Sequence, residues 1–209
     1  MVRLNTRERQ KQIINASIEI IKDRGIQNLT MQKIAERIGI TEQAVYRHFS
    51  SKLEILIAIV RYFDVCCSDI DRPGLSEGAP CAVRKIERMG QNHLNYFHNH
   101  PAVATVIFSE EIFQNEKELA EVVTSALERR LNKMTRLIEK GQVNGEFNNW
   151  ISAEHMAHML LGSMRLLITR WRLTDFSFNI RESGEKLISD ILSLFKTYVE
   201  SEVSSLYIK

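Results

Sequence analysis

The segment GITEQAVYRHFSSK, which begins at Gly39, carries side chains suited to binding nucleic acid. The amide of glutamine can donate to N7 and accept from N6 of adenine, and the guanidinium of arginine can donate to N7 and O6 of guanine. Hydroxyl, imidazole and ammonium groups donate instead to phosphate oxygens, and these contacts fix the register of a protein on DNA without reading its sequence. The base-reading candidates are Gln43 and Arg47, and the phosphate-binding candidates are Tyr46, His48 and Lys52.

Glu42 lies on the same predicted surface, and two placements are open for it. A carboxylate can accept a hydrogen bond from the amino group of cytosine. Without that bond a carboxylate facing DNA is repelled by the phosphates, which favours pairing with Arg47 or contact with solvent.

The charge of the chain is unevenly distributed. Residues 1–52 carry ten Lys and Arg against five Asp and Glu, whereas the remainder carries 18 against 21. A basic first quarter on a mildly acidic remainder indicates a small anion-binding head on a larger body, although a chance asymmetry of a few charges gives the same count.

A three-helix unit is predicted to position the segment. Apolar spacing predicts a first helix at 6–23, which Gly25 can end with a positive φ. Thr30 and Thr41 are typical N-caps of two further short helices, separated by Gly39. Such a pair, braced by a third helix, is the pattern of a helix-turn-helix, whose recognition helix enters a major groove about 12 Å wide. The inward set of the recognition helix is Ala44, Val45 and Phe49.

The rest of the chain is also predicted to be helical, because only three prolines and nine glycines interrupt it. Ser51 and Glu54 form the S-x-x-E pattern of a capping box, which opens a fourth helix. The segment DIDRPGLSEGAP, at 69–80, is the clearest loop. Five more helices are predicted at about 80–99, 101–114, 115–141, 152–173 and 180–204, so the fold class is all-α with about nine helices.

The string LTMQKIAERIGITEQAVYRHFSSKLEILIAIV, residues 29–60, resembles the DNA-binding region of the TetR/AcrR family of transcriptional regulators. It meets the family pattern T-x-x-x-I-A-x-x-x-G-[IV]-[ST]-x-x-x-[LV]-Y-x-H-F-x-x-K-x-x-L, with the end blurred at Ile55 and Leu56. The resemblance covers about residues 6–63. It implies an N-terminal three-helix helix-turn-helix head at 1–51, a connecting helix at 52–68, and a C-terminal helical ligand-binding and dimerisation domain at 69–209.

Carried over residue by residue, the family pattern assigns DNA contacts to the second, third and fourth helices. It implies that Thr30 and Gln32 lie near phosphates at the start of the second helix, and that Lys52 lies at the start of the fourth, where the helix N-terminus also favours phosphate. The full implied set is Thr30, Gln32, Thr41, Glu42, Gln43, Tyr46, Arg47, His48 and Lys52.

A homodimer is also implied by the resemblance, and the last helix gives independent support. It carries two apolar sets, one containing Leu187, Ile191, Leu194 and Tyr198 and the other Ile188, Leu192, Phe195 and Val199. One set can face the core of the same chain and the other a two-fold related copy, and the sequence leaves open which does which. The alternative is that both sets are buried within one chain. The predicted interface is Leu160, Ser163, Leu167, Leu187, Ile191, Leu194 and Tyr198.

An effector pocket is predicted between the middle helices, although ordinary core packing explains each of its residues equally well. Arg165 interrupts the apolar run MLLGSMRLLI, where it can meet a ligand carboxylate or pair with Glu110 or Glu111. The candidate liners are Met89, His93, Phe97, Phe108, Phe113, Met159, Met164, Arg165 and Trp171.

The sequence therefore predicts a ligand-responsive repressor that binds a palindromic operator in double-stranded DNA as a homodimer and is released by a partly apolar small molecule. The alternatives are a DNA-binding helical protein without an effector, and an activator. An enzyme is not predicted, because the chain lacks a nucleophile–base constellation and a phosphate-binding loop.

The composition of the chain bears on its cellular compartment and on metal or cofactor binding. Three cysteines without C-x-x-C spacing fit a reducing compartment, and no apolar run reaches 18 residues, so we expect a cytoplasmic protein without membrane contact. The histidine pairs His98–His100 and His155–His158 lack a carboxylate at the spacing of a metal site. No metal and no cofactor are predicted.

Overall fold

The computed structural model describes residues 5–69, 81–108 and 116–196, and of residues 65–69 only the backbone. The described residues form nine α-helices, which confirms the predicted all-α class. The N-terminal elements are α1 (Thr6–Arg24), the 3-10 turn η1 (Ile26–Asn28), α2 (Met31–Ile38), α3 (Glu42–Tyr46) and α4 (Lys52–Asp69). The later ones are α5 (Ala82–Asn99), α6 (Pro101–Ile107), α8 (Lys117–Val143), α9 (Ala153–Leu173) and α10 (Ile180–Phe195).

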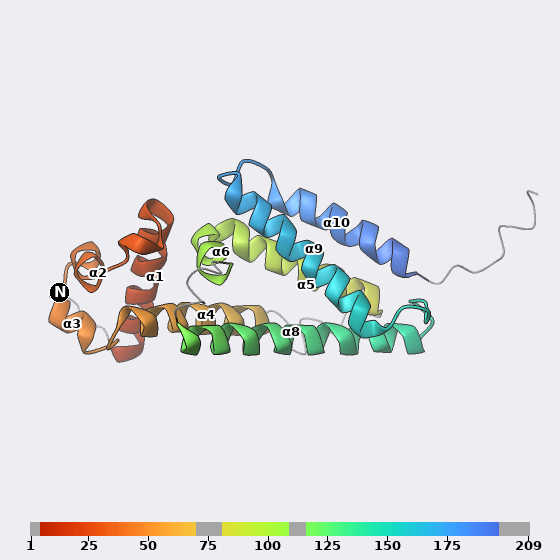
Figure 1. Ribbon diagram of the computed structural model, residues 1–209, viewed down its shortest axis with the longest axis horizontal. Coiled ribbons are helices and arrows are strands. Elements are labelled where there is room, and N and C mark those ends of the chain that lie inside the picture. Colours follow the sequence, from red (N-terminus) through yellow and green to blue (C-terminus); the bar gives the residue numbers. More distant parts are fainter. Residues whose placement is uncertain (1–4, 70–80, 109–115, 197–209) are drawn as a thin grey trace, which may run out of the picture.

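The helices form a small head and a larger body, joined mainly by α4 (Figure 1). Helices α1–α3 make the head, and α4 runs from it into the body, where it packs on α8. Helix α1 also packs directly on α6, so the head has a second contact with the body. Helices α9 and α10 lie side by side on the other side of the body from α4. No helix in the described ranges is both long and apolar enough to cross a membrane.

Local capping chemistry explains the two short helices of the head. The Thr30 hydroxyl accepts from the backbone N–H of Lys33 at 3.2 Å, and the Thr41 hydroxyl accepts from that of Ala44 at the same distance. Gly39 ends α2 in the left-handed region, with φ 69°, where a side chain would cost free energy. Both predicted N-caps and the predicted helix end are confirmed.

The capping of α4 differs in one detail from the predicted capping box. Ser51 Oγ accepts from the Glu54 backbone N–H at 3.1 Å, as predicted. The Glu54 carboxylate, however, accepts from the backbone N–H and the hydroxyl of Ser50, one residue earlier than the box requires. The carboxylate thereby also fixes the turn that carries the chain from α3 into α4.

The last helix is shorter than predicted. It ends at Phe195, and Lys196 has extended backbone angles, φ −60° and ψ 148°, so the prediction of a helix to 204 was wrong at this end. Asn148, from the turn before α9, donates to the Phe195 carbonyl through its backbone N–H at 2.8 Å and its side-chain Nδ2 at 3.0 Å. An isolated bridge joins Phe147 to Lys196. This cap comes from a distant turn, so the pattern around residue 195 alone does not reveal it.

We expect a close approach at Gly141 to make this position intolerant of a methyl group. A Cβ built there would lie 2.6 Å from Cε2 of Phe147 and 3.0 Å from Cβ of Ala82. Gly141→Ala should therefore lower the free energy of unfolding by roughly 1–3 kcal/mol, although alanine normally favours a helix over glycine. Urea denaturation followed by circular dichroism measures the change.

The matched control for Gly141→Ala is Glu139→Ala, at an exposed position two residues earlier in α8. We expect it to change the unfolding free energy by less than about 0.5 kcal/mol. If Gly141→Ala unfolded at the same urea concentration as the native chain, the contact with Phe147 would not be restrictive.

Candidate DNA-contact surface and effector cavity

Helix α3 lies at the far end of the head (Figure 1), and its polar side chains are exposed to solvent. Glu42, Gln43 and Arg47 are exposed, and Tyr46 is 50% exposed. On the opposite side Val45 is fully buried, as predicted for the inward set. The short helix therefore turns its hydrogen-bonding side chains outward, which is the arrangement that reading base edges requires.

The predicted phosphate contacts at α2 and α3 have intramolecular roles as well. The hydroxyls of Thr30 and Thr41 accept cap hydrogen bonds, and a hydroxyl that accepts can still donate its own proton to a phosphate. Gln32 Nε2 donates to Glu36 Oε1 at 2.9 Å, so a phosphate contact would compete with that bond. Both threonines and Gln32 are exposed.

Lys52 and His48 are more enclosed than a purely phosphate-binding role requires. Lys52 Nζ donates to the carbonyl of Ile26 at 2.8 Å, and burial lowers the pKa of its ammonium. This bond ties the start of α4 to the turn after α1. His48 is half-buried, and its Nδ1 is shielded from solvent without a hydrogen-bond partner among the described residues. The Lys52–Ile26 bond spans 26 positions, so no local pattern signals it.

The outer face of α9 and α10 is apolar. Leu166 and Leu173 on α9 are 70% and 72% exposed, and Leu194 on α10 is 67% exposed. Helical spacing places Leu166, Leu173 and the half-exposed Met159 on one stripe of α9. Exposed leucines grouped on adjacent helices are unusual for a monomer and mark a contact surface.

The structure separates the two apolar sets of α10. Ile188, Leu192 and Phe195 are buried in the core of the chain, whereas Leu187 and Ile191 are half-buried and Leu194 is exposed. The outward set is thus the one assigned to the interface by sequence, with Tyr198 outside the described residues. Ser163 and Leu167 are half-buried. Leu160 is a correction, because it is 2% exposed and lines the interior cavity. Leu166 and Leu173 were missed, although their spacing along α9 was visible.

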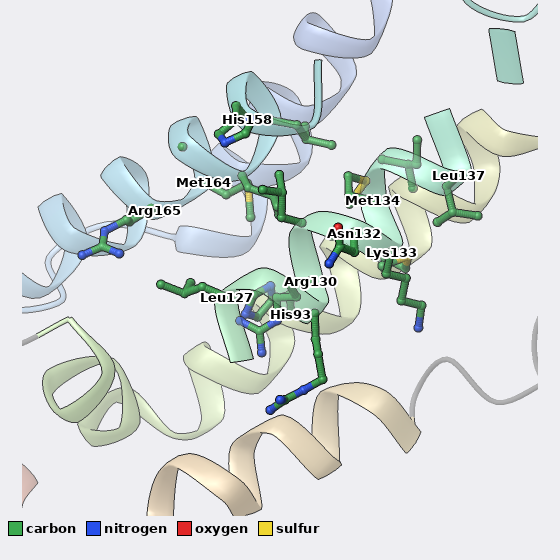
Figure 2. A pocket seen from close by; sticks show the side chains of 18 of the residues that line it. His93, Leu127, Arg130, Asn132, Lys133, Met134, Leu137, His158, Met164 and Arg165 are labelled. Carbon is green, nitrogen blue, oxygen red and sulfur yellow. The ribbon is translucent and has the colours of Figure 1, made fainter. Parts of the chain in front are cut away.

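A cavity of about 880 Å³ lies within the body, between α5, α8 and α9 (Figure 2). Helix α10 contributes Ile188 to its wall, α4 contributes Asp64, and Phe108 enters the wall directly after the end of α6. Most of the wall is apolar, including Met89, Met134, Met164, Leu160 and Ile168. The volume is in the range that holds a drug-sized ligand.

The predicted pocket residues divide into three groups. Met89, His93, Phe108, Met164 and Arg165 line the cavity. Phe97, Met159 and Trp171 do not: Phe97 is fully buried against the ring of His93, Met159 is exposed, and Trp171 is buried with Nε1 donating to the Phe178 carbonyl at 3.0 Å. Phe113, Glu110 and Glu111 lie outside the described residues. Arg165 lies over the Phe108 ring, with 5.4 Å between its Cζ and the ring centroid.

Arg130 lines the cavity beside the predicted His93, and the sequence prediction missed it. Arg130 of α8 has its Cζ 4.5 Å from the centroid of the Phe63 ring, and the His93 ring centroid lies 5.5 Å from the same centroid. Burial, and then the charge of Arg130, hold the pKa of His93 well below its usual range, so this imidazole is neutral at pH 7. Arg130 follows Arg129 on a charged stretch of α8, and nothing in that pattern distinguishes the arginine that turns inward.

Within the described part of the chain, no group of three or more His, Cys, Asp and Glu side chains is arranged to hold a metal ion. The candidate functional features of the described residues are the polar face of α3 on the head, the apolar outer face of α9 and α10, and the cavity in the body. These features together are those expected of a DNA-binding regulator.

The family comparison agrees with that class. Residues 13–59 match the model for "Bacterial regulatory proteins, tetR family", and residues 76–194 match that for "YsiA-like protein, C-terminal region". The chain belongs to the TetR family of bacterial transcriptional regulators, and it is a DNA-binding transcriptional regulator. Proteins of this family are regulators and not enzymes; they bind DNA, act as dimers and bind small-molecule ligands.

Three relatives illustrate the range of similarity. The fatty acid metabolism regulator protein of Bacillus subtilis is 23% identical over 189 residues, covering 90% of this chain and 95% of that protein. Nucleoid occlusion factor SlmA of Vibrio vulnificus is 19% identical over 180 residues, covering 85% and 91%. The crystal structure of FadR from Bacillus subtilis in complex with stearoyl-CoA matches with a TM-score of 0.68 and 22% identity, covering 88% of this chain and 96% of that one.

Proposed function

We propose that this regulator is a repressor that binds a palindromic operator as a homodimer and is released when a partly apolar small molecule enters the cavity. The observation that carries the proposal is the position of the cavity. Asp64 of α4 contributes to its wall, and α4 is the helix that begins at the DNA-binding head. A ligand that changes the position of α4 would change the placement of both heads in a dimer, and thus their fit to DNA.

The DNA contacts that we propose come from the exposed face of α3 and its surroundings. Gln43 and Arg47 read bases, with Glu42 able to accept from a cytosine in the same groove. The phosphate contacts come from Thr30, Gln32, Thr41, Tyr46, His48 and Lys52. The exposure of the first three and of Tyr46 supports this assignment, whereas His48 and Lys52 need some local rearrangement to reach a phosphate.

We propose a separate role for each of three parts of the chain. Residues 1–51 bind DNA, residues 52–68 connect, and residues 69–209 bind the ligand and the second copy. The exposed apolar face of α9 and α10 supports dimerisation through these two helices. A two-fold axis would place this face of one copy in contact with the same face of the second copy. A dimer of this kind requires an operator with two inverted half-sites.

The effector that we propose has a long apolar portion. The apolar wall of the cavity supports this, and so do a relative named for fatty acid metabolism and one crystallised with stearoyl-CoA.

The decisive experiment is selection of bound fragments from the genomic DNA of the source organism, followed by fluorescence anisotropy on the enriched site. We expect an inverted repeat whose affinity falls steeply with salt, and release when a long-chain acyl compound is added. An in vitro transcription assay on the same promoter should show lower transcript with the protein bound. Failure to enrich any site at low salt would contradict DNA recognition, binding that no ligand affects would favour an effector-free protein, and higher transcript would indicate an activator.

A further inference from the structure

Two nitrogen atoms at one end of the cavity are shielded from solvent and have no hydrogen-bond partner in the described part of the chain. They are Nη2 of Arg130, on α8, and Nε2 of His93, on α5. Both residues line the cavity, and Figure 2 shows them together on the side of the pocket toward α4. A buried polar group without a partner is destabilising, and native proteins contain few of them.

The surroundings of this pair give the guanidinium no compensating charge. Among the described residues no carboxylate lies within ion-pair distance of Arg130, and the nearby Asp64 is bound to Arg129 at 2.6 Å. The nearest groups are aromatic: the ring of Phe63 lies under Arg130 and beside His93, and Phe97 stacks on His93 with 5.0 Å between ring centroids. Arg130 is half-buried, and a cation partly shielded from solvent attracts an anion more strongly than a fully exposed one does.

The rest of the wall shows what else the ligand must carry. Met134, Met164 and Ile168 face the same cavity, and they offer no hydrogen bond to a polar ligand body. Methionine side chains adapt to an irregular or flexible apolar chain more readily than branched ones do. The cavity thus combines Arg130, beside His93, with an apolar stretch of wall, while further cations such as Arg136 and Arg165 line other parts of it.

We propose that Arg130 binds the carboxylate of an amphipathic acid, with a hydrogen bond from His93 to the same head group and the hydrocarbon portion in the methionine-lined remainder. A guanidinium can donate two parallel N–H bonds to a carboxylate, and a neutral imidazole can donate one more. The site deepens the proposed function and rests on it, because it specifies the head group of the effector. It also places that head group next to Phe63 of α4.

The test is calorimetric binding of hexadecanoic acid and its methyl ester to the full-length protein, below their micelle concentrations. The two ligands share a tail and differ in the charge of the head. We expect the acid to bind about 10- to 100-fold more tightly than the ester, as for a hydrogen bond to a charged group. In Arg130→Met the acid should lose that advantage while the ester binds as before.

Arg136→Met is the matched control, since Arg136 lies on the same helix, lines the same cavity and is exposed. It should leave the acid-to-ester ratio unchanged. An equal affinity for acid and ester in the native protein would overturn the proposal even if Arg130→Met failed to fold. So would a preference for the acid that persisted in Arg130→Met.

A third ligand, hexadecanoyl-CoA, separates the carboxylate from another source of negative charge. If it bound more tightly than the acid, with equal affinity in the native protein and in Arg130→Met, the anionic contact would lie elsewhere and the proposal would be overturned. If the ester bound and released DNA as well as the acid did, the regulator function would stand and only the head-group assignment would fail. If DNA binding persisted and none of the three ligands bound, the effector would not be an acyl compound, and the proposal would fail together with the proposed effector class.

Discussion

Replacing both Leu166 and Leu173 with glutamate should convert the protein into monomers and abolish tight operator binding. The two side chains are 70% and 72% exposed on α9, beside the outward set of α10. A two-fold dimer through this face would bury four new carboxylates without partners, and each would cost several kcal/mol. The dimer dissociation constant should therefore rise at least about a thousandfold, which sedimentation velocity can measure.

The consequence for DNA binding follows from the loss of the second head. A dimer binds its second half-site as an intramolecular event, which raises overall affinity by about 10²- to 10⁴-fold over one head alone. Operator affinity should fall by that amount, whereas helical content should stay unchanged, because both leucines already face solvent in the single chain.

The control is Val143→Glu, which introduces the same charge at an 87% exposed apolar residue at the end of α8. We expect this variant to remain dimeric and to bind the operator normally. A double variant that sedimented as a dimer would place the interface on another surface.

Arg47→Ala and Lys52→Ala should weaken DNA binding in different ways. Arg47 is exposed at the end of α3, and losing a bidentate contact with guanine costs about 1–3 kcal/mol in each half-site. Selection with randomised half-sites should show a relaxed preference at one position. Lys52→Ala should instead weaken all sequences alike and reduce the salt dependence of binding.

The structure adds a second effect for Lys52. Its Nζ donates to the Ile26 carbonyl, so Lys52→Ala should also lower the stability of the head by up to about 1 kcal/mol, whereas Arg47→Ala should not. Thermal unfolding monitored by circular dichroism separates this from the DNA effect. Lys186→Ala, an exposed lysine of α10, is the control for both measurements. An equal loss across all sequences for Arg47→Ala would contradict its role in reading bases.

The head is the part of the fold that local sequence predicts best. Thr30 and Thr41 cap their helices through bonds that span three residues, and Gly39 takes a φ that other residues avoid. These interactions are complete within a few positions, so the pattern of residue types is sufficient to identify them. The outward side of α3 follows from its period in the same way, because Val45 must be buried.

The cavity shows the limit of that reasoning. Met89, Met164 and Trp171 have the same apolar character and helical setting, yet the first two line the cavity and the third does not. Periodicity indicates that a residue faces inward, but it does not indicate whether a neighbouring helix fills the space in front of it. Met159 was placed in the pocket for its apolar character alone, but it lies at an outward position of α9 and is 50% exposed.

The sequence by itself determined the all-α class, the caps and turns of the head, the outward polar side of α3 and the family, because each depends on residue types and contacts among near neighbours. Only the tertiary structure decided which apolar face of α10 points outward, where α10 ends, and which charges face the cavity. The cap that Asn148 gives to Phe195 and the enclosure of Arg130 beside His93 join residues far apart in the chain. Whether a particular charged side chain such as Arg130 is enclosed depends on how the neighbouring helices pack against it, which the local sequence does not specify.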